Sequence, residues 1–192
     1  RDADNFQRLA GHLIYAAPAL RPPSEVVAAG AGGQPDLWAL GISGDLPIAL
    51  VTIGEARDIT LARQMLQAHT YWRMHGLSVD LVILNEEPGS YERPLQERLK
   101  RLIQAHSLMS GTDQPGGIFL RNAALIPEED LKLLKTVASV MLVAARGTLP
   151  QQLRAPVEAP ELFEFFLGFI DELSDISNVS IDQRSIDSLP EL

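Results

Sequence analysis

Four short apolar segments of the chain are each followed by polar or charged side chains of types that bind ligands. These are Glu55 and Arg57 after the first segment, Asn85, Glu86 and Glu87 after the second, Arg121 and Asn122 after the third, and Arg146, Gly147 and Thr148 after the fourth. Ligands of open α/β sheets bind beyond the carboxyl ends of the strands. One prediction is therefore an anion held by Arg121, Arg146 and the backbone amides around Thr148. Asn85 and Glu86 would lie at the same edge. The alternative is that these residues only cap helices and carry surface charge.

A second candidate is the segment Gly41-Ile42-Ser43-Gly44-Asp45. Its pattern is close to a nucleophile elbow, but that motif needs a glycine where Asp45 stands and a turn from a strand into a helix. Here the turn leads into a strand instead. We favour a structured turn. A sugar-contacting loop made of Trp38, Ser43 and Asp45 is the alternative, because carbohydrate sites combine carboxylates with aromatic faces.

The residue types exclude several kinds of reaction centre. The 192 residues contain no cysteine, which excludes disulfides, thiol nucleophiles and thiolate metal sites. His69 and His75 do not have the i, i+4 spacing of a helical metal pair. The adjacent Glu86 and Glu87 do not span the gap of about 5 Å or more that separates the paired carboxylates of glycosidases. We expect no catalytic residue, no metal and no cofactor in this chain.

The negative charge of the chain is concentrated at its C-terminal end. The net charge is −9, and residues 155–192 hold nine acidic residues and one basic residue, whereas the first 154 residues are nearly balanced. Neither part attracts a phosphate backbone, so we expect no nucleic-acid partner. No apolar run reaches the ~18 residues of a membrane span. The chain starts in the middle of a helical pattern and without Met, and we interpret it as a piece of a longer protein.

The hydrophobic pattern changes from helical to strand-like and back along the chain. Short apolar runs rich in Val, Ile and Leu predict buried strands at 47–53, 79–84, 117–120 and 140–144. Apolar residues at helical spacing predict helices over 3–15, 58–75, 94–107 and 127–138. A capping box at 148–151 predicts a short last helix. The glycine-rich residues 111–117 precede a strand rather than follow one, and we expect a flexible loop there.

Alternating strands and helices predict an α/β fold. We expect a small, open, mostly parallel four-stranded sheet with helices on both faces, preceded by a helix and followed by an acidic tail that contains aromatic residues. The predicted parts are a linker helix and loop at 1–36, the α/β module at 37–154 and the tail at 155–192. The tail combines a cluster of phenylalanines with a weakly patterned acidic stretch, and we expect part of it to be disordered.

Several stretches of the module resemble a known family. The most distinctive are residues 37–48 (LWALGISGDLPI) and 79–86 (VDLVILNE), supported by residues 6–15, 68–73 and 146–149. Over about residues 5–154 they resemble an internal segment of the cyclic β-1,2-glucan synthases, bacterial inner-membrane enzymes that also carry glycosyltransferase 36 or glycoside phosphorylase modules.

The resemblance implies a parent enzyme and a place within it. Enzymes of that family build and cyclise β-1,2-glucan from UDP-glucose at the cytoplasmic face of the inner membrane, and their catalytic residues do not map onto this segment. It implies that the chain is a non-catalytic module, with neighbouring carbohydrate-active modules, and the glucan itself, as partners. A domain that binds a nucleotide sugar, phosphate or glucan at the strand ends is the alternative.

Overall fold

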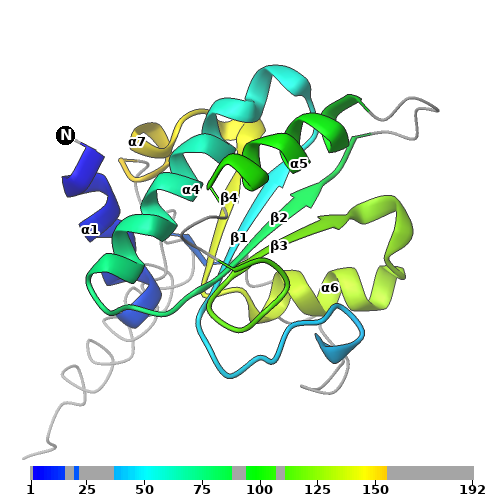
Figure 1. The fold of residues 1–192 in the computed structure, drawn as a ribbon, viewed down its shortest axis with the longest axis horizontal. Coiled ribbons are helices and arrows are strands. Elements are labelled where there is room, and N and C mark those ends of the chain that lie inside the picture. The colour runs from blue at the N-terminus through cyan, green and yellow to red at the C-terminus, as the bar shows by residue number, and fades with distance from the viewer. Residues whose placement is uncertain (1, 16–19, 22–36, 88–93, 107–110, 155–192) are drawn as a thin grey trace, which may run out of the picture. The chain divides into compact units, whose positions relative to one another are not determined.

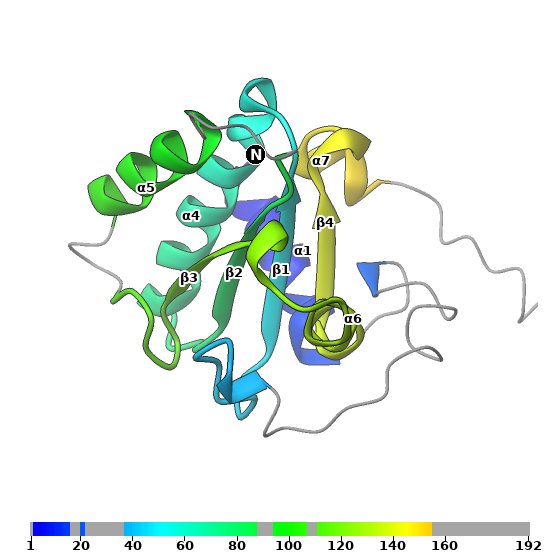
Figure 2. The ribbon, with the colours of Figure 1, turned by 90° about the vertical axis from the view of Figure 1, so that its right-hand side faces the viewer.

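A computed structural model describes residues 2–15, 20–21, 37–87, 94–106 and 111–154. Its centre is a sheet of four parallel strands in the order β3-β2-β1-β4. The strands are β1 (Ile48–Ile53), β2 (Asp80–Asn85), β3 (Ile118–Asn122) and β4 (Val140–Val143). Every residue of β1 and β2 is buried, which explains their continuous apolar sequences. Figure 2 shows the four strands side by side in this order.

Helices connect the strands by parallel crossovers. The connecting helices are α4 (Ile59–Met74), α5 (Pro94–His106) and α6 (Glu128–Val137), while α1 (Asp2–Tyr15) precedes the first strand and the short α7 (Leu149–Gln152) follows the last. The end of α4 illustrates how the local sequence sets a boundary. Gly76 adopts a φ of +77°, and the amides of Gly76 and Leu77 bond back to the carbonyls of Arg73 and Trp72. This is the Schellman arrangement that a glycine at the helix end favours.

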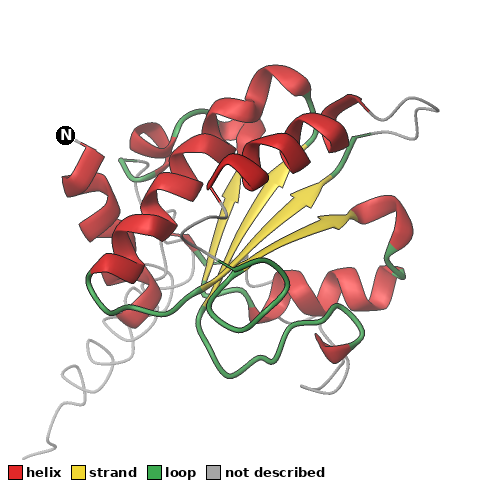
Figure 3. Cartoon of the chain, in the orientation of Figure 1, coloured by secondary structure: helices red, strands yellow, loops and turns green. Residues whose placement is uncertain are grey.

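Each face of the sheet is covered by its own hydrophobic cluster. On one face, α1, α4, α5 and α7 contribute apolar side chains such as Leu9, Met65 and Leu99. On the other face, α6 and the segment 37–42 pack against the strands through Leu134 and Ile42. Figures 1 and 3 show α4 and α5 on one side of the strands and α6 on the other. The reversal of direction after β3 produces this arrangement, because right-handed crossovers in opposite directions place their helices on opposite faces.

The first helix is part of the same packed unit as the sheet. The indole Nε1 of Trp72 in α4 donates a buried hydrogen bond of 2.9 Å to the carbonyl of Phe6, and the Phe6 ring lies 5.8 Å from that of Tyr71. These contacts pack α1 on α4. The predicted boundary between 1–36 and 37–154 stays a prediction. The predicted tail at 155–192 lies outside the described residues.

The predicted fold class is confirmed, and each predicted element is found with ends that differ by a few residues. The glycine-rich residues 111–117 differ from the expected flexible loop. The backbone amides of Gly117 and Ile118 close the loop by donating hydrogen bonds to the carbonyls of Gln114 and Gly111, respectively. The Asp80 carboxyl also accepts a hydrogen bond from the Gly116 amide. The sequence-based prediction missed this because Asp80 is 36 residues away.

Candidate functional site

The carboxyl edge of the sheet has its topological switch point between β1 and β4. The chain leaves β1 toward β2 and returns after β3 to the opposite side of β1. Loops that diverge in this way leave a crevice where α/β sheets bind ligands. Glu55 and Arg57 follow β1 there, and they form an exposed ion pair of 2.9 Å with each other. Arg146 and Thr148 follow β4 at the same switch point.

Thr148 fulfils the predicted capping role. The side-chain oxygen Oε1 of Gln151 accepts hydrogen bonds from the Thr148 amide at 2.7 Å and from the Thr148 hydroxyl at 2.9 Å. The preceding Gly147 has a φ of +99°, a conformation that favours glycine. Arg146 is exposed, and among the described residues its guanidinium makes no hydrogen bond or ion pair. Arg146 is therefore a cation at the switch point that is open to solvent.

The polar side chains at the end of β2 hold neighbouring elements in place. Asn85 is buried; its Nδ2 donates to Gln96 Oε1 at 2.8 Å, and its Oδ1 accepts from the Glu87 amide at 2.9 Å. These bonds join the end of β2 to the start of α5. Glu86 forms a half-buried ion pair of 2.9 Å with Lys135 of α6. The predicted pair of binding groups, Asn85 and Glu86, thus connects the sheet to a helix on each face.

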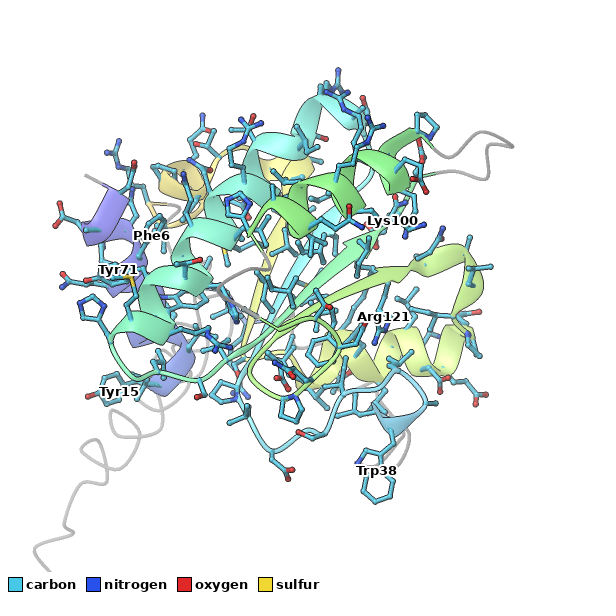
Figure 4. The ribbon with its side chains drawn as sticks, in the orientation of Figure 1. Phe6, Tyr15, Trp38, Tyr71, Lys100 and Arg121 are labelled. Carbon is cyan, nitrogen blue, oxygen red and sulfur yellow. The ribbon has the colours of Figure 1, made fainter. Side chains whose placement is uncertain are left out.

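Arg121 points away from the switch point. Its Nε and Nη2 donate to the carbonyl of Leu40 at 2.8 and 2.6 Å, and its Nη1 donates to Asp113 at 2.7 Å. The guanidinium also lies over the Phe119 ring, 5.3 Å from the centroid. Figure 4 shows Arg121 on the side of the sheet that carries α6 and Trp38. Arg121 therefore fastens residues 37–42 to β3.

Trp38, Ser43 and Asp45 lie together at one turn, as their spacing predicts. The Trp38 indole Nε1 donates to the Ser43 carbonyl at 3.4 Å, and the Ser43 hydroxyl accepts from the Asp45 amide at 3.2 Å. Trp38 and Asp45 are exposed. Gly41, within the turn, has a φ of +72°, and a Cβ added there would lie 3.1 Å from Arg121 Nη2. The close approach of Arg121 thus adds to the conformational reason for glycine.

The eight predicted site residues form separate groups rather than one crevice. Arg146 and Thr148 lie at the end of one edge strand, and Arg121 lies on the opposite edge strand. Two strands stand between them, and three inter-strand spacings amount to about 14 Å. Arg121 is instead joined to the turn that carries Trp38, Ser43 and Asp45. Asn85 and Glu86 occupy the end of β2 between the two edges.

A buried polar cluster at the amino end of β2 escaped the sequence-based analysis. His69 and Asp80 are both fully buried. His69 Nε2 lies 3.0 Å from the Val79 carbonyl, and Asp80 Oδ1 accepts from the Gly116 amide at 2.6 Å. Arg73 donates to the Gly116 carbonyl at 3.0 Å, so Gly116 is held from both sides. The signal available in the sequence was Asp80 itself, an acid inside a buried apolar run.

Burial determines the protonation of these two groups. Loss of solvation raises the pKa of Asp80, and the nearby negative charge of Asp45 raises it further, against the opposing effect of the Gly116 hydrogen bond. Loss of solvation likewise lowers the pKa of His69, which keeps the imidazole neutral near pH 7. Within the described residues, no three His, Asp or Glu side chains gather in a group that could hold a metal ion. The cluster has the character of a packing element.

Comparison with known proteins identifies the relatives of the chain. No family model matches it. Over 196 aligned residues, which include 97% of this chain, it is 31% identical to the cyclic beta-(1,2)-glucan synthase NdvB of Rhizobium meliloti (strain 1021). This chain is homologous to a segment of a cyclic β-(1,2)-glucan synthase. The predicted resemblance is confirmed. The chain spans 7% of the length of that synthase.

The homology and the fold together define what kind of part this is. The aligned segment includes the whole parallel sheet and its helices, so the α/β unit as a whole corresponds to a segment of that synthase. None of the helices in the described part of the chain has the length and apolar character that a bilayer crossing requires. The strand order, with the switch point at β1 and β4, is Rossmann-like.

Proposed function

We propose that this chain is a non-catalytic α/β module of a cyclic β-1,2-glucan synthase, an enzyme that builds and cyclises β-1,2-glucan from UDP-glucose. The module holds neighbouring carbohydrate-active modules of the same protein in position, at the cytoplasmic face of the bacterial inner membrane. The observation that carries this proposal is the use of the strand-end side chains. Asn85, Glu86, Arg121 and Thr148 all bind other parts of the module.

A reaction centre would use such side chains differently. Catalytic groups converge on one point and present donors or acceptors to the reacting atoms. Here the Asn85 amide bonds Gln96 and the Glu87 backbone, and Arg121 bonds Leu40 and Asp113. The bonds to Gln96, Leu40 and Asp113 join separate segments of the module, and the bond to Glu87 closes the turn after β2. The arrangement stabilises a rigid body, which is the property that a positioning module needs.

The test is carried out in a full-length synthase that carries this segment. Asn85→Ala and Arg121→Met are compared with Arg98→Gln, which changes an exposed side chain of α5. Glucan synthesis from UDP-glucose is divided by the amount of folded enzyme. For a positioning module, Asn85→Ala and Arg121→Met lower the amount of folded enzyme, while turnover per folded enzyme stays within about twofold.

Loss of a general acid or base typically lowers turnover by a factor of 10² to 10⁴. A fall of that size in Asn85→Ala or Arg121→Met, with normal amounts of folded enzyme, would show that the module takes part in the reaction. Arg98→Gln measures the effect of removing an exposed charge away from the strand ends. It is expected to leave both the folded amount and the turnover unchanged.

A second function is favoured by one residue, Arg146. Its exposed guanidinium stands at the switch point of the sheet, where parallel α/β sheets bind anionic ligands. In this alternative the module binds phosphate or a nucleotide sugar there. Titration of the chain with phosphate and with UDP-glucose by calorimetry tests it. Binding that is lost in Arg146→Ala and kept in Arg98→Ala, a variant of an exposed arginine of α5, would support this alternative, and absence of heat with both ligands would reject it.

A further inference from the structure

The turn of residues 37–45 presents an exposed tryptophan from a well-anchored base. The two tryptophans of the chain have opposite surroundings, since Trp72 is 1% exposed and Trp38 is 62% exposed. Tryptophan carries the largest apolar surface of any side chain, and leaving it in water forgoes the free energy of burying it. Figure 4 shows Trp38 projecting outward below α6.

The base of the turn is held by packing and by hydrogen bonds. Leu37, Leu40 and Ile42, which flank Trp38, are buried against the sheet and α6. The amides of Leu40 and Ile42 bond back to the Leu37 carbonyl at 2.9 and 3.1 Å. Arg121 binds the Leu40 carbonyl through two nitrogens. The backbone that carries the indole is therefore anchored on both sides of it.

The indole ring is oriented as well as exposed. Its single donor, Nε1, is directed to the Ser43 carbonyl of the same turn. This bond restrains rotation of the ring, and 62% of the side chain remains exposed. Next to the ring, the Ser43 hydroxyl orders the backbone that carries the exposed Asp45 carboxylate. The turn thus combines an exposed aromatic ring with the Ser43 hydroxyl and the exposed Asp45 carboxylate.

This surface matches one class of ligand chemistry. A β-linked glucose ring has C–H groups on its two faces and hydroxyl groups around its rim, so it stacks on an aromatic face while its hydroxyls donate to a neighbouring carboxylate. The charge of the turn disfavours an anion. Asp45 lies close enough to Asp80 to raise the pKa of that carboxyl, and the neighbouring cation, Arg121, is already paired with the Asp113 carboxylate. The preferred ligand is neutral.

We propose that the Trp38 indole, together with Ser43 and Asp45, forms a stacking platform for a neutral β-linked glucose chain. The identity of the sugar rests on the proposed function, because the homologous synthase is named for a β-1,2-glucan. The platform lies on the turn that precedes β1, on the α6 side of the sheet. It is separate from the switch point at Arg146, so the two sites are tested independently.

The experiment titrates the 192-residue chain with linear β-1,2-glucooligosaccharides while the two indole N–H signals are followed by ¹⁵N NMR. The Trp38 signal is expected to shift and the Trp72 signal to stay in place. Trp38→Ala is expected to weaken binding by about tenfold or more, and Trp38→Tyr, which keeps an aromatic face, by less. Met74→Ala is the matched control, because Met74 is another exposed apolar residue, at 78%, and lies at the end of α4.

Two results would overturn the platform. One is an unchanged Trp38 signal up to the highest soluble oligosaccharide concentration. The other is a shift of Trp38 by UDP-glucose at the same or a lower concentration, which would indicate a nucleotide-sugar site. Because Trp38 is exposed, its variants are expected to unfold at the wild-type temperature, and thermal melts check this. Absence of glucan binding at Trp38 would not change the outcome of the synthesis assay with Asn85→Ala and Arg121→Met, so the two proposals are tested independently.

Discussion

Replacing Arg121 by methionine tests whether this side chain holds the turn of residues 37–45 on the sheet. Methionine keeps most of the apolar length of arginine and removes every donor of the guanidinium. In the structure, Nε and Nη2 both reach the Leu40 carbonyl, at 2.8 and 2.6 Å. The side chain is 20% exposed, so most of it lies out of water. We expect a clear loss of stability.

The size of the loss follows from the individual contacts. A hydrogen bond from a charged donor contributes about 1.5–3 kcal/mol, and we count the two bonds to Leu40 as one because they share an acceptor oxygen. The contact with the Phe119 ring adds about 0.5–1 kcal/mol. The ion pair with Asp113, whose side chain is 62% exposed, adds at most about 1 kcal/mol. The total is about 3 kcal/mol.

Urea unfolding and thermal melting of the chain measure this quantity. For a domain of this size, 1 kcal/mol corresponds to about 2–4 °C, so a loss of about 3 kcal/mol lowers the melting temperature by about 6–12 °C. Asp113→Ala is the matched control and is expected to cost less than Arg121→Met, at most about 2 kcal/mol, because it removes an exposed ion pair and places alanine at a φ of +52°. Acrylamide quenching of Trp38 fluorescence adds a local measurement, and it is expected to increase in Arg121→Met.

A loss below about 1 kcal/mol in Arg121→Met would refute the reasoning, since that is no more than an exposed ion pair contributes. Equal losses in Arg121→Met and Asp113→Ala would also refute it. In that case the pair with Asp113, rather than the bonds to Leu40, would carry the stabilisation. The anchored base assumed for the Trp38 platform would then need another cause.

Three further predictions concern the packing around the sheet. Asp80→Asn is expected to raise the melting temperature at pH 7. Because the pKa of Asp80 is raised in the folded state, the stability that its protonated form gives is complete below about pH 3.8 and is lost as pH rises. The difference in melting temperature from wild type should therefore vanish in acid, and a difference independent of pH would contradict this. Trp72→Phe removes the buried bond to the Phe6 carbonyl and is expected to cost about 1–3 kcal/mol in urea unfolding; a neutral result would mean that α1 does not depend on it. Gly41→Ala is expected to cost about 1–2 kcal/mol in the same assay because of its positive φ, and a stabilised variant would argue against that backbone conformation.

The elements of the fold could be predicted because their signals are local. Val, Ile and Leu in continuous runs mark strands buried on both faces, and β1 and β2 are buried along their whole length. Gly76 at the end of α4 and the Thr148–Gln151 capping pair act over a few residues. Alternation of these elements implied a parallel sheet, and the sheet is parallel throughout. Each of these inferences needs only neighbouring residues.

The candidate site was predicted less completely because side-chain partners come from distant parts of the chain. Trp38, Ser43 and Asp45 were grouped correctly since they belong to one turn. Arg121 was grouped with Arg146 on the rule that strand ends share an edge, and that rule does not state the strand order. With β3 and β4 at opposite edges, the two arginines are kept apart.

Residue types and their local spacing therefore identified the strands, the helices, the caps and the glycines of this chain, since backbone preferences and hydrophobic periodicity act over one or two turns of helix or strand. The bonds from Arg121 to Leu40 and from Asp80 to Gly116 join residues 81 and 36 positions apart. The strand order and the opposite exposures of Trp38 and Trp72 likewise depend on how distant parts of the chain pack. Such contacts are set by how the layers pack, because a side chain's partner is chosen by distance in space and not by distance along the chain.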